Sequence, residues 1–80
     1  MIEKSDLQAA LSRNIPRLRK EAGRSQQQLA DSIGISRITV NRIENGRLVP
    51  RADLLYSLAD ALGVSADVLR QISAPVRKIG

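Results

Sequence analysis

The stretch that decides the fold is SQQQLADSIGISRITVNRIENG, which runs from Ser25 to Gly46. It contains two short amphipathic helical patterns with a turn at Gly34 between them. The apolar positions are Leu29, Ala30 and Ile33 in the first pattern, and Val40 and Ile43 in the second. Each predicted helix therefore has one apolar face, and the glycine marks the point where the chain turns between them.

The second predicted helix carries an unusual polar face. At about 100° per residue, five side chains fall within an arc of roughly 140°. They are Arg37, Ile38, Asn41, Arg42 and Asn45. A solvated helix face would more usually mix Lys with Glu, whereas Arg and Asn are the side chains that pair with guanine and adenine edges in the DNA major groove. The pattern therefore predicts a helix-turn-helix that binds double-stranded DNA.

Two motifs, LRKEAGRSQQQLADSIGISRITVNRIENG and the run PRADLLYSLADALGV from Pro50 to Val64, resemble the Cro and lambdoid-repressor family, also called the XRE family. The resemblance covers residues 11–72. It implies an all-α fold, a compact five-helix lambda-repressor-like DNA-binding domain with the helix-turn-helix at helices 2 and 3. We expect residues 1–10 to be an N-terminal helical extension, 11–72 the DNA-binding domain and 73–80 a C-terminal tail.

Composition limits the function classes. Eighty residues form one small domain, and the chain has neither Cys nor His. Disulfides, Cys-containing zinc sites and the commonest general base are thereby excluded. We therefore expect a protein that is not an enzyme and that holds no cofactor and no metal. The sequence has no apolar run of membrane-spanning length, so we also expect no membrane partner and a soluble, cytoplasmic protein.

The positive charge is concentrated in one segment. Residues 13–51 hold nine basic and three acidic side chains, a net charge of +6, whereas the rest of the chain has a net charge of −1. Basic small proteins are common, so charge alone is weak support. A basic segment that coincides with the helix-turn-helix nevertheless matches a polyanion-binding surface.

Several positions predict where the helices begin and end. Ser25 with Gln28 forms a capping-box pattern at the first of the two paired helices, and Ser36 is placed to cap the second. We expect a fourth helix over 52–62 and a fifth from 66 to about 72. Pro16 lies within the first helical run, so we expect a kink or a break near residues 13–15. A break would make residues 6–13 a separate helix.

The resemblance implies base-reading roles for Arg37, Ile38, Asn41 and Arg42. Either arginine can pair with O6 and N7 of a guanine, and Ile38 suits a thymine methyl group. Alternatives stay open: each arginine could contact a phosphate or only solvent, Asn41 could contact adenine or phosphate, and Ile38 could lie on a partner surface.

The resemblance also implies phosphate contacts around this face. The candidates are Gln26, Arg24, Thr39, Asn45, Arg47 and Arg51. The positive end of the helix that begins near Gln26 would also favour a phosphate. In the family, the acid of the I-E-N-G motif pairs with an arginine of the first helix. The resemblance therefore implies a partly buried structural ion pair between Arg19 and Glu44.

The C-terminal half carries surplus apolar residues, of which Leu54, Tyr56, Val68 and Ile72 are candidates for a homodimer interface. A slightly apolar monomer is the alternative. The expected function is a sequence-specific transcriptional regulator that binds a near-palindromic operator as a homodimer. We expect it to repress by occluding a promoter, and activation through a contact with RNA polymerase is the alternative. The alternatives are an antitoxin that binds a toxin partner and autoregulates its operon, and a protein-interaction module on the same fold.

Overall fold

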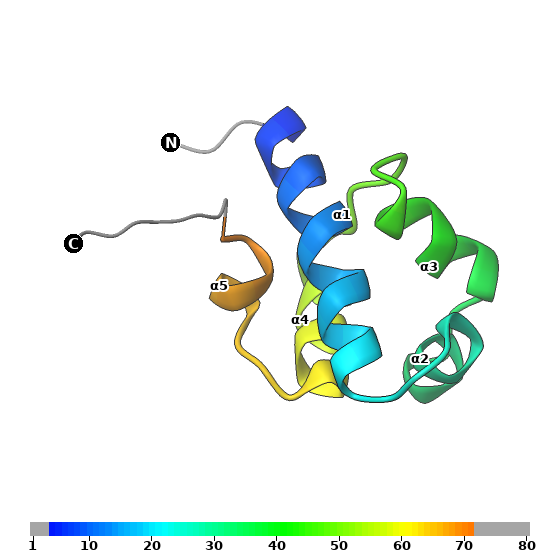
Figure 1. Ribbon diagram of the computed structural model, residues 1–80. Helices are drawn as coiled ribbons and strands as arrows, with labels where there is room; N and C mark the ends of the chain where they lie inside the picture. The colour runs from blue at the N-terminus through cyan, green and yellow to red at the C-terminus, as the bar shows by residue number, and fades with distance from the viewer. Residues whose placement is uncertain (1–3, 72–80) are drawn as a thin grey trace.

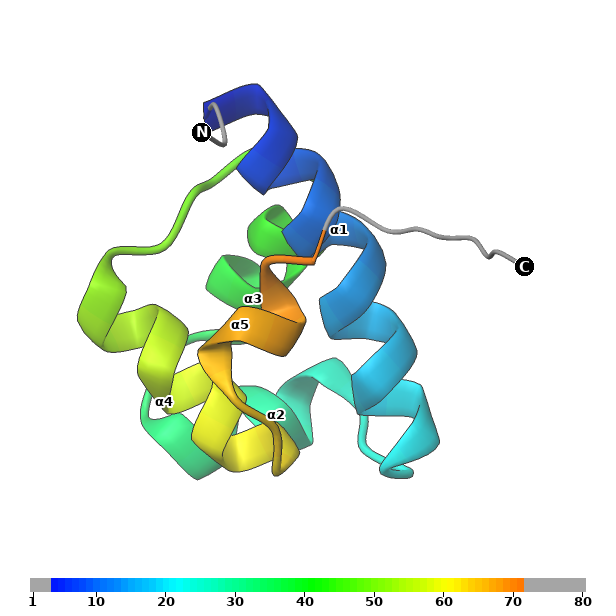
Figure 2. The same cartoon turned by 90° about the vertical axis from the view of Figure 1, so that its left-hand side faces the viewer.

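The computed structural model describes residues 4–71, and in this range the chain forms five α-helices and no strand. They are α1 (Lys4–Glu21), α2 (Gln26–Ile33), α3 (Arg37–Glu44), α4 (Ala52–Leu62) and α5 (Ala66–Leu69). α2 and α3 lie on one side of α1 and α5 lies on the other (Figure 1). The turned view shows α4 and α5 next to each other, with α1 opposite α4 (Figure 2). A membrane-spanning helix needs about 20 mostly apolar residues, and no helix among the described residues has such a stretch.

Helix α1 continues through Pro16 without interruption. Of the two outcomes that Pro16 predicts near residues 13–15, a kink or a break, the break does not occur, and residues 6–13 are not a separate helix. Leu11 and Ile15 are fully buried before the proline, and Leu18 packs against the core after it. Because both halves of the helix bury apolar side chains against the same core, packing outweighs the one hydrogen-bond donor that proline lacks. Residues 4–10 are thus the first part of α1, and the domain boundary at residue 10 stays a prediction.

The local signals of the helix-turn-helix are present as predicted. Ser25 Oγ accepts a hydrogen bond from the Gln28 backbone N–H at 3.0 Å, and Gln28 Oε1 accepts one from the Ser25 backbone N–H at 2.8 Å. Ser36 Oγ accepts from the Thr39 N–H at the start of α3. Gly34 ends α2 with φ of 75°, a left-handed conformation that side chains disfavour. These caps fix where α2 ends and α3 begins.

The core is aliphatic and draws on all five helices. Its buried members are Leu11, Ile15, Leu29, Ala30, Val40, Ile43, Leu55, Leu58, Ala59 and Leu69. Helix α5 contributes Leu69 and ends there, three residues short of the predicted end. A buried polar side chain holds this short helix. Asn14 Nδ2 donates to the carbonyl oxygens of Val68, Leu69 and Gln71 at 3.3, 2.8 and 2.9 Å. The end of α5 is therefore tied to the middle of α1.

Candidate nucleic-acid interface

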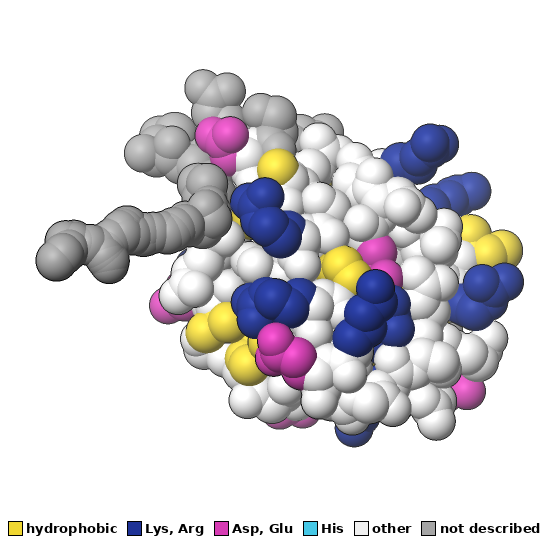
Figure 3. All heavy atoms as spheres, in the orientation of Figure 1, with side chains coloured by type: hydrophobic (Ala, Val, Ile, Leu, Met, Phe, Trp, Pro, Cys, Tyr) yellow, Lys and Arg dark blue, Asp and Glu magenta, His cyan; other side chains and the backbone are white. Residues whose placement is uncertain are grey.

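The polar face of α3 is open to solvent. Val40 and Ile43 are buried beneath the helix, so its opposite side projects outward. All five side chains of this face are exposed, namely Arg37, Ile38, Asn41, Arg42 and Asn45. In the space-filling view, basic groups project over α3 at the right-hand edge, with a hydrophobic group among them (Figure 3). Ile38 is 59% exposed, so its side chain is available to a ligand and is not part of the core.

The loop after α3 supplies two further basic side chains. Arg47 lies in this loop and Arg51 at its end, and both are exposed. Arg51 occupies the N-cap position of α4, where its side chain makes no capping hydrogen bond. Gly46 turns the chain at φ of 72°, and the Arg47 N–H donates to the Arg42 carbonyl at 2.8 Å. The turn thereby keeps the loop directly against the end of α3.

The expected ion pair between Arg19 and Glu44 is present. Arg19 Nε donates to Glu44 Oε2 at 2.7 Å and Arg19 Nη2 donates to Glu44 Oε1 at 3.1 Å, so the pair is bidentate. The two side chains are only 10% and 6% exposed. Arg19 Nη1 also donates to the Arg24 carbonyl at 2.8 Å. The hydrogen bond to Glu44 raises the pKa of Arg19 above its ordinary value, against the opposing effect of burial. One guanidinium therefore joins α1 to α3 and to the loop before α2.

Gln26 belongs to the same network. Gln26 Nε2 donates to Glu44 Oε1 at 2.9 Å, and Gln26 Oε1 accepts from Asn41 Nδ2 at 3.4 Å. Asn45 Nδ2 donates to Asn41 Oδ1 at 3.0 Å. From the sequence, Gln26, Asn41 and Asn45 are separate candidates for phosphate or base contacts, and the hydrogen bonds that connect them are not predicted. Helical periodicity places Asn41 and Asn45 on one face, but it carries no signal for a contact between α2 and α3.

The remaining phosphate candidates differ in how freely they project. Thr39 is half buried, and its hydroxyl lies 2.9 Å from the Ser36 hydroxyl. Arg24 is also half buried, in the loop between α1 and α2. Neither side chain is as open as Arg47 or Arg51. The two loop arginines are thus the freest candidates for a phosphate contact.

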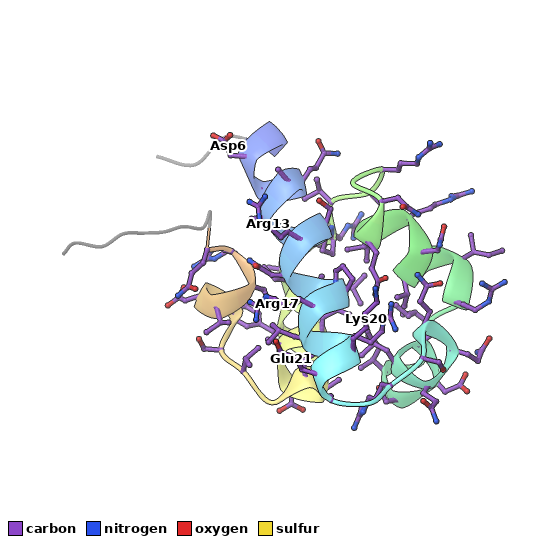
Figure 4. All side chains as sticks on the ribbon, in the orientation of Figure 1. Asp6, Arg13, Arg17, Lys20 and Glu21 are labelled. Atoms are coloured by element: carbon purple, nitrogen blue, oxygen red, sulfur yellow. The ribbon has the colours of Figure 1, made fainter. Side chains whose placement is uncertain are left out.

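Part of the basic segment lies away from α3. Arg13, Arg17 and Lys20 follow one another along α1, which faces the viewer, while the outer side chains of α3 project at the right (Figure 4). Arg17 also pairs with Glu21 at 3.4 Å, an exposed contact within one helix. The net charge of the segment therefore overstates the charge on the surface around α3.

The structure separates the residues predicted for a dimer interface. Leu54 is half buried and lines a hollow with Ile33 and Ile35. Tyr56, which is 64% exposed, lies two residues further along α4 and therefore about 160° around the helix from Leu54. Val68 is half buried on α5, and Ile72 lies outside the described residues. Leu54 and Tyr56 thus occupy opposite flanks of α4.

Comparisons with known proteins agree with this architecture. A sequence model of the helix-turn-helix family matches residues 17–69. The chain is 38% identical over 60 residues to the uncharacterised HTH-type transcriptional regulator y4dJ of Sinorhizobium fredii, covering 75% of this chain and 78% of that relative. It is 41% identical over 51 residues to the cryptic phage CTXphi transcriptional repressor RstR of Vibrio cholerae, covering 64% of this chain and 46% of the repressor. The match thus spans about half of that repressor's length.

Solved structures show the same fold. A hypothetical transcription factor, NHTF, from Neisseria superposes with a TM-score of 0.79 at 32% identity, covering 89% of this chain and 82% of that one. The clp gene regulator ClgR from C. glutamicum gives a TM-score of 0.73 at 34% identity, covering 79% of this chain and 82% of that one. With five helices in residues 4–71, the paired helices α2 and α3 and the matched family model, the fold is the predicted lambda-repressor-like one. The chain belongs to the helix-turn-helix family of DNA-binding transcriptional regulators, of the Cro and lambdoid-repressor (XRE) type.

Proposed function

We propose that this protein binds a near-palindromic operator as a homodimer and represses transcription by occluding a promoter. The observation that carries the proposal is the exposed Arg/Asn face of α3, held outward by the buried Val40 and Ile43. In this proposal α3 enters the major groove, where Arg37 and Arg42 pair with guanines, Ile38 packs on a thymine methyl and Asn41 contacts adenine. The named role of the relative RstR as a repressor supports the direction of regulation.

Backbone contacts would surround the base contacts. Arg47 and Arg51 project from the loop after α3, and the start of α2 offers free backbone N–H groups near Gln26. Asn45, Thr39 and Arg24 are the further candidates. Such contacts fix the register of the protein on the duplex and supply most of the salt dependence, but they carry little sequence information.

Two copies are proposed because one domain of this size contacts few phosphates. A two-fold dimer doubles these contacts and sets two half-sites about 34 Å apart, one turn of DNA. Since Leu54 and Tyr56 lie on opposite flanks of α4, a single two-fold patch on α4 uses one of them. Tyr56 is the more exposed, and large aromatic side chains are enriched in interfaces, so we place the interface on its flank.

Selection of bound duplexes from a pool with a randomised centre tests the proposal. The expected product is a pair of inverted half-sites one helical turn apart. Affinity for that site should fall with salt along a log–log slope of about −0.9 per phosphate neutralised. A pool that yields no shared sequence, together with a flat salt response, would contradict DNA readout and favour the protein-interaction alternative.

A further inference from the structure

A row of three side-chain amides begins at a buried carboxylate and ends on the surface of α3. Glu44 Oε1 accepts from Gln26 Nε2 at 2.9 Å, Gln26 Oε1 accepts from Asn41 Nδ2 at 3.4 Å, and Asn41 Oδ1 accepts from Asn45 Nδ2 at 3.0 Å. Asn45 Nδ2 also donates to the Asn41 carbonyl at 2.9 Å. The Glu44 end is almost covered, whereas Asn41 and Asn45 are exposed. The network thus leads from the interior to the proposed DNA-binding face.

The carboxylate gives this row a direction. An ionised carboxylate can only accept hydrogen bonds, so Gln26 must turn its NH₂ group toward Glu44. Its carbonyl oxygen then faces Asn41, which must offer an N–H in turn. This leaves Asn41 Oδ1 on the side of Asn45, where it meets an NH₂ group. Each amide orientation follows from the one before it, and the first is fixed by the charge of Glu44.

The reversed orientation of Asn41 is unfavourable. If that amide turned over, its oxygen would face Gln26 Oε1 and its nitrogen would face Asn45 Nδ2. Two hydrogen bonds would be replaced by an acceptor–acceptor and a donor–donor contact. Turning Gln26 over as well would relieve the first contact but would place its oxygen against the Glu44 carboxylate. The ion pair with Arg19 prevents Glu44 from moving away, because Arg19 holds both carboxylate oxygens.

The remaining hydrogen-bonding capacity of Asn41 matches one base. Its side chain has two N–H donors and two oxygen lone pairs, and Gln26 and Asn45 each occupy one. One donor and one acceptor remain. Adenine presents an acceptor at N7 and a donor at N6 in the major groove, whereas guanine presents two acceptors, at N7 and O6. A fixed amide with one free donor and one free acceptor therefore suits adenine.

We propose that Glu44 is a positioning residue for base readout and that, through Gln26, it holds the Asn41 amide in the orientation that selects adenine. This inference rests on the proposed function, since it requires α3 in the major groove. It gives Gln26 a second role besides any phosphate contact. It also makes the ion pair between Arg19 and Glu44 part of the specificity of the protein.

The test compares variants on an operator recovered from the random pool, with each base pair of one half-site changed in turn. Asn41→Ala identifies the base pair that Asn41 contacts. Gln26→Met removes both hydrogen bonds of Gln26 with little change in side-chain length and leaves the ion pair intact. Gln27→Met is the matched control, because Gln27 is exposed next to it and bonds only Asp31 in the described structure.

The wild type is expected to prefer adenine at that base pair by about tenfold or more. Gln26→Met should lower this preference nearly to that of Asn41→Ala, while the preference at the other positions stays unchanged and circular dichroism shows the variant folded. The double variant should lose no further preference at that position, because both changes remove the same contact. Gln27→Met should keep the wild-type preference.

The outcomes separate this inference from the proposed function. If Gln26→Met keeps the wild-type preference for adenine, even while it binds every sequence more weakly, the inference is overturned and sequence-specific binding stands. The same holds if Gln26→Met loses preference at a different base pair from Asn41→Ala. Absence of any sequence preference in the wild type overturns the proposed function itself. Glu44→Gln gives a second measurement, because a neutral amide at position 44 accepts either orientation of Gln26. If circular dichroism shows this variant folded, its adenine preference should also fall, and an unchanged preference overturns the inference.

Discussion

Arg19 and Glu44, 25 positions apart in the sequence, meet in a bidentate ion pair at the junction of α1 with the end of α3. Both side chains are at least 90% covered. A covered ion pair contributes little net stability by itself, since both charges lose their hydration. Removal of one partner is costly, because the other charge then stays buried without compensation. The pair therefore specifies how α3 is seated on α1.

Glu44→Ala should lower the free energy of unfolding by about 3–5 kcal/mol. For a domain of this size that corresponds to a melting temperature lower by more than about 10 °C. Thermal unfolding followed by circular dichroism gives the measurement. Glu21→Ala is the control, since its exposed pair with Arg17 should contribute at most about 1 kcal/mol. Equal melting temperatures for Glu44→Ala and wild type would show that the pair is not structural.

Arg19→Lys should also be destabilising, by about 1–3 kcal/mol, although it keeps the charge. Lysine cannot form the two parallel bonds to Glu44 together with the bond to the Arg24 carbonyl. Chemical denaturation of both proteins would measure this difference. A variant as stable as the wild type would mean that charge alone suffices at position 19.

The difference in stability between the wild type and Arg19→Lys should depend on pH. The hydrogen bond to Glu44 raises the pKa of Arg19. A raised pKa contributes stability below the unfolded-state value, and that stability is lost only as the pH rises through the folded-state value. For arginine both values lie above the working range. For lysine the loss should begin above its ordinary pKa of about 10.4, so the stability difference should be constant from about pH 7 to 9.5 and widen beyond it. A difference that narrows at high pH would contradict this assignment.

Asn14 should be essential for holding α5. Asn14→Ala leaves buried carbonyl groups at the end of α5 without their donor, which should cost about 1–3 kcal/mol. Asn14→Asp should cost more, because an ionised carboxylate would face carbonyl oxygens in a buried position. Arg13→Ala, at the exposed neighbouring position, is the control. Hydrogen exchange at the α5 amides would localise the effect. Equal stabilities of the Ala and Asp variants would contradict the role of the Asn14 hydrogen bonds in holding α5.

Arg42 and Arg47 should differ in the kind of binding they supply. Arg42→Ala is expected to weaken specific binding by about 1–3 kcal/mol and to relax the preference at one base pair. Arg47→Ala should weaken binding to specific and random DNA alike and reduce the magnitude of the salt slope by about 1. Fluorescence anisotropy on both duplexes at several salt concentrations separates the two. Equal loss for Arg42→Ala on specific and random DNA would reassign it to a phosphate.

Tyr56 and Leu54 test the placement of the dimer interface. Tyr56→Arg should weaken self-association at least tenfold in sedimentation equilibrium, because it places a charge in the interface core on each subunit. Leu54→Ser, on the opposite flank of α4, should leave the association constant unchanged. The reverse result would move the interface to the hollow that Leu54 forms with Ile33 and Ile35.

Local signals in the sequence were sufficient for much of the fold. Ser25 with Gln28, Ser36 and Gly34 predicted the boundaries of α2 and α3, because caps and turns depend on neighbouring residues. The exposed face of α3 could also be predicted, because the helical period depends only on residues within one short segment. Pro16 predicted a kink or a break, and the break does not occur, because the packing of Leu11, Ile15 and Leu18 outweighs the local cost of proline. The local sequence carries no signal for that packing. The length of α5 was overestimated because its end is fixed by Asn14, a residue of another helix.

The sequence by itself determined the family, the paired helices and which side chains α3 presents, since these depend on motifs, caps and periodicity within short segments. The ion pair of Arg19 with Glu44 came from the family resemblance and not from the spacing of the two residues. Only the tertiary structure decided that Gln26 joins Glu44 to Asn41, that Asn14 holds the end of α5, and that Leu54 and Tyr56 lie apart. Each of these depends on how helices distant in the chain are oriented against one another. That orientation is fixed by the packing of the shared core, and no local pattern of residues encodes it.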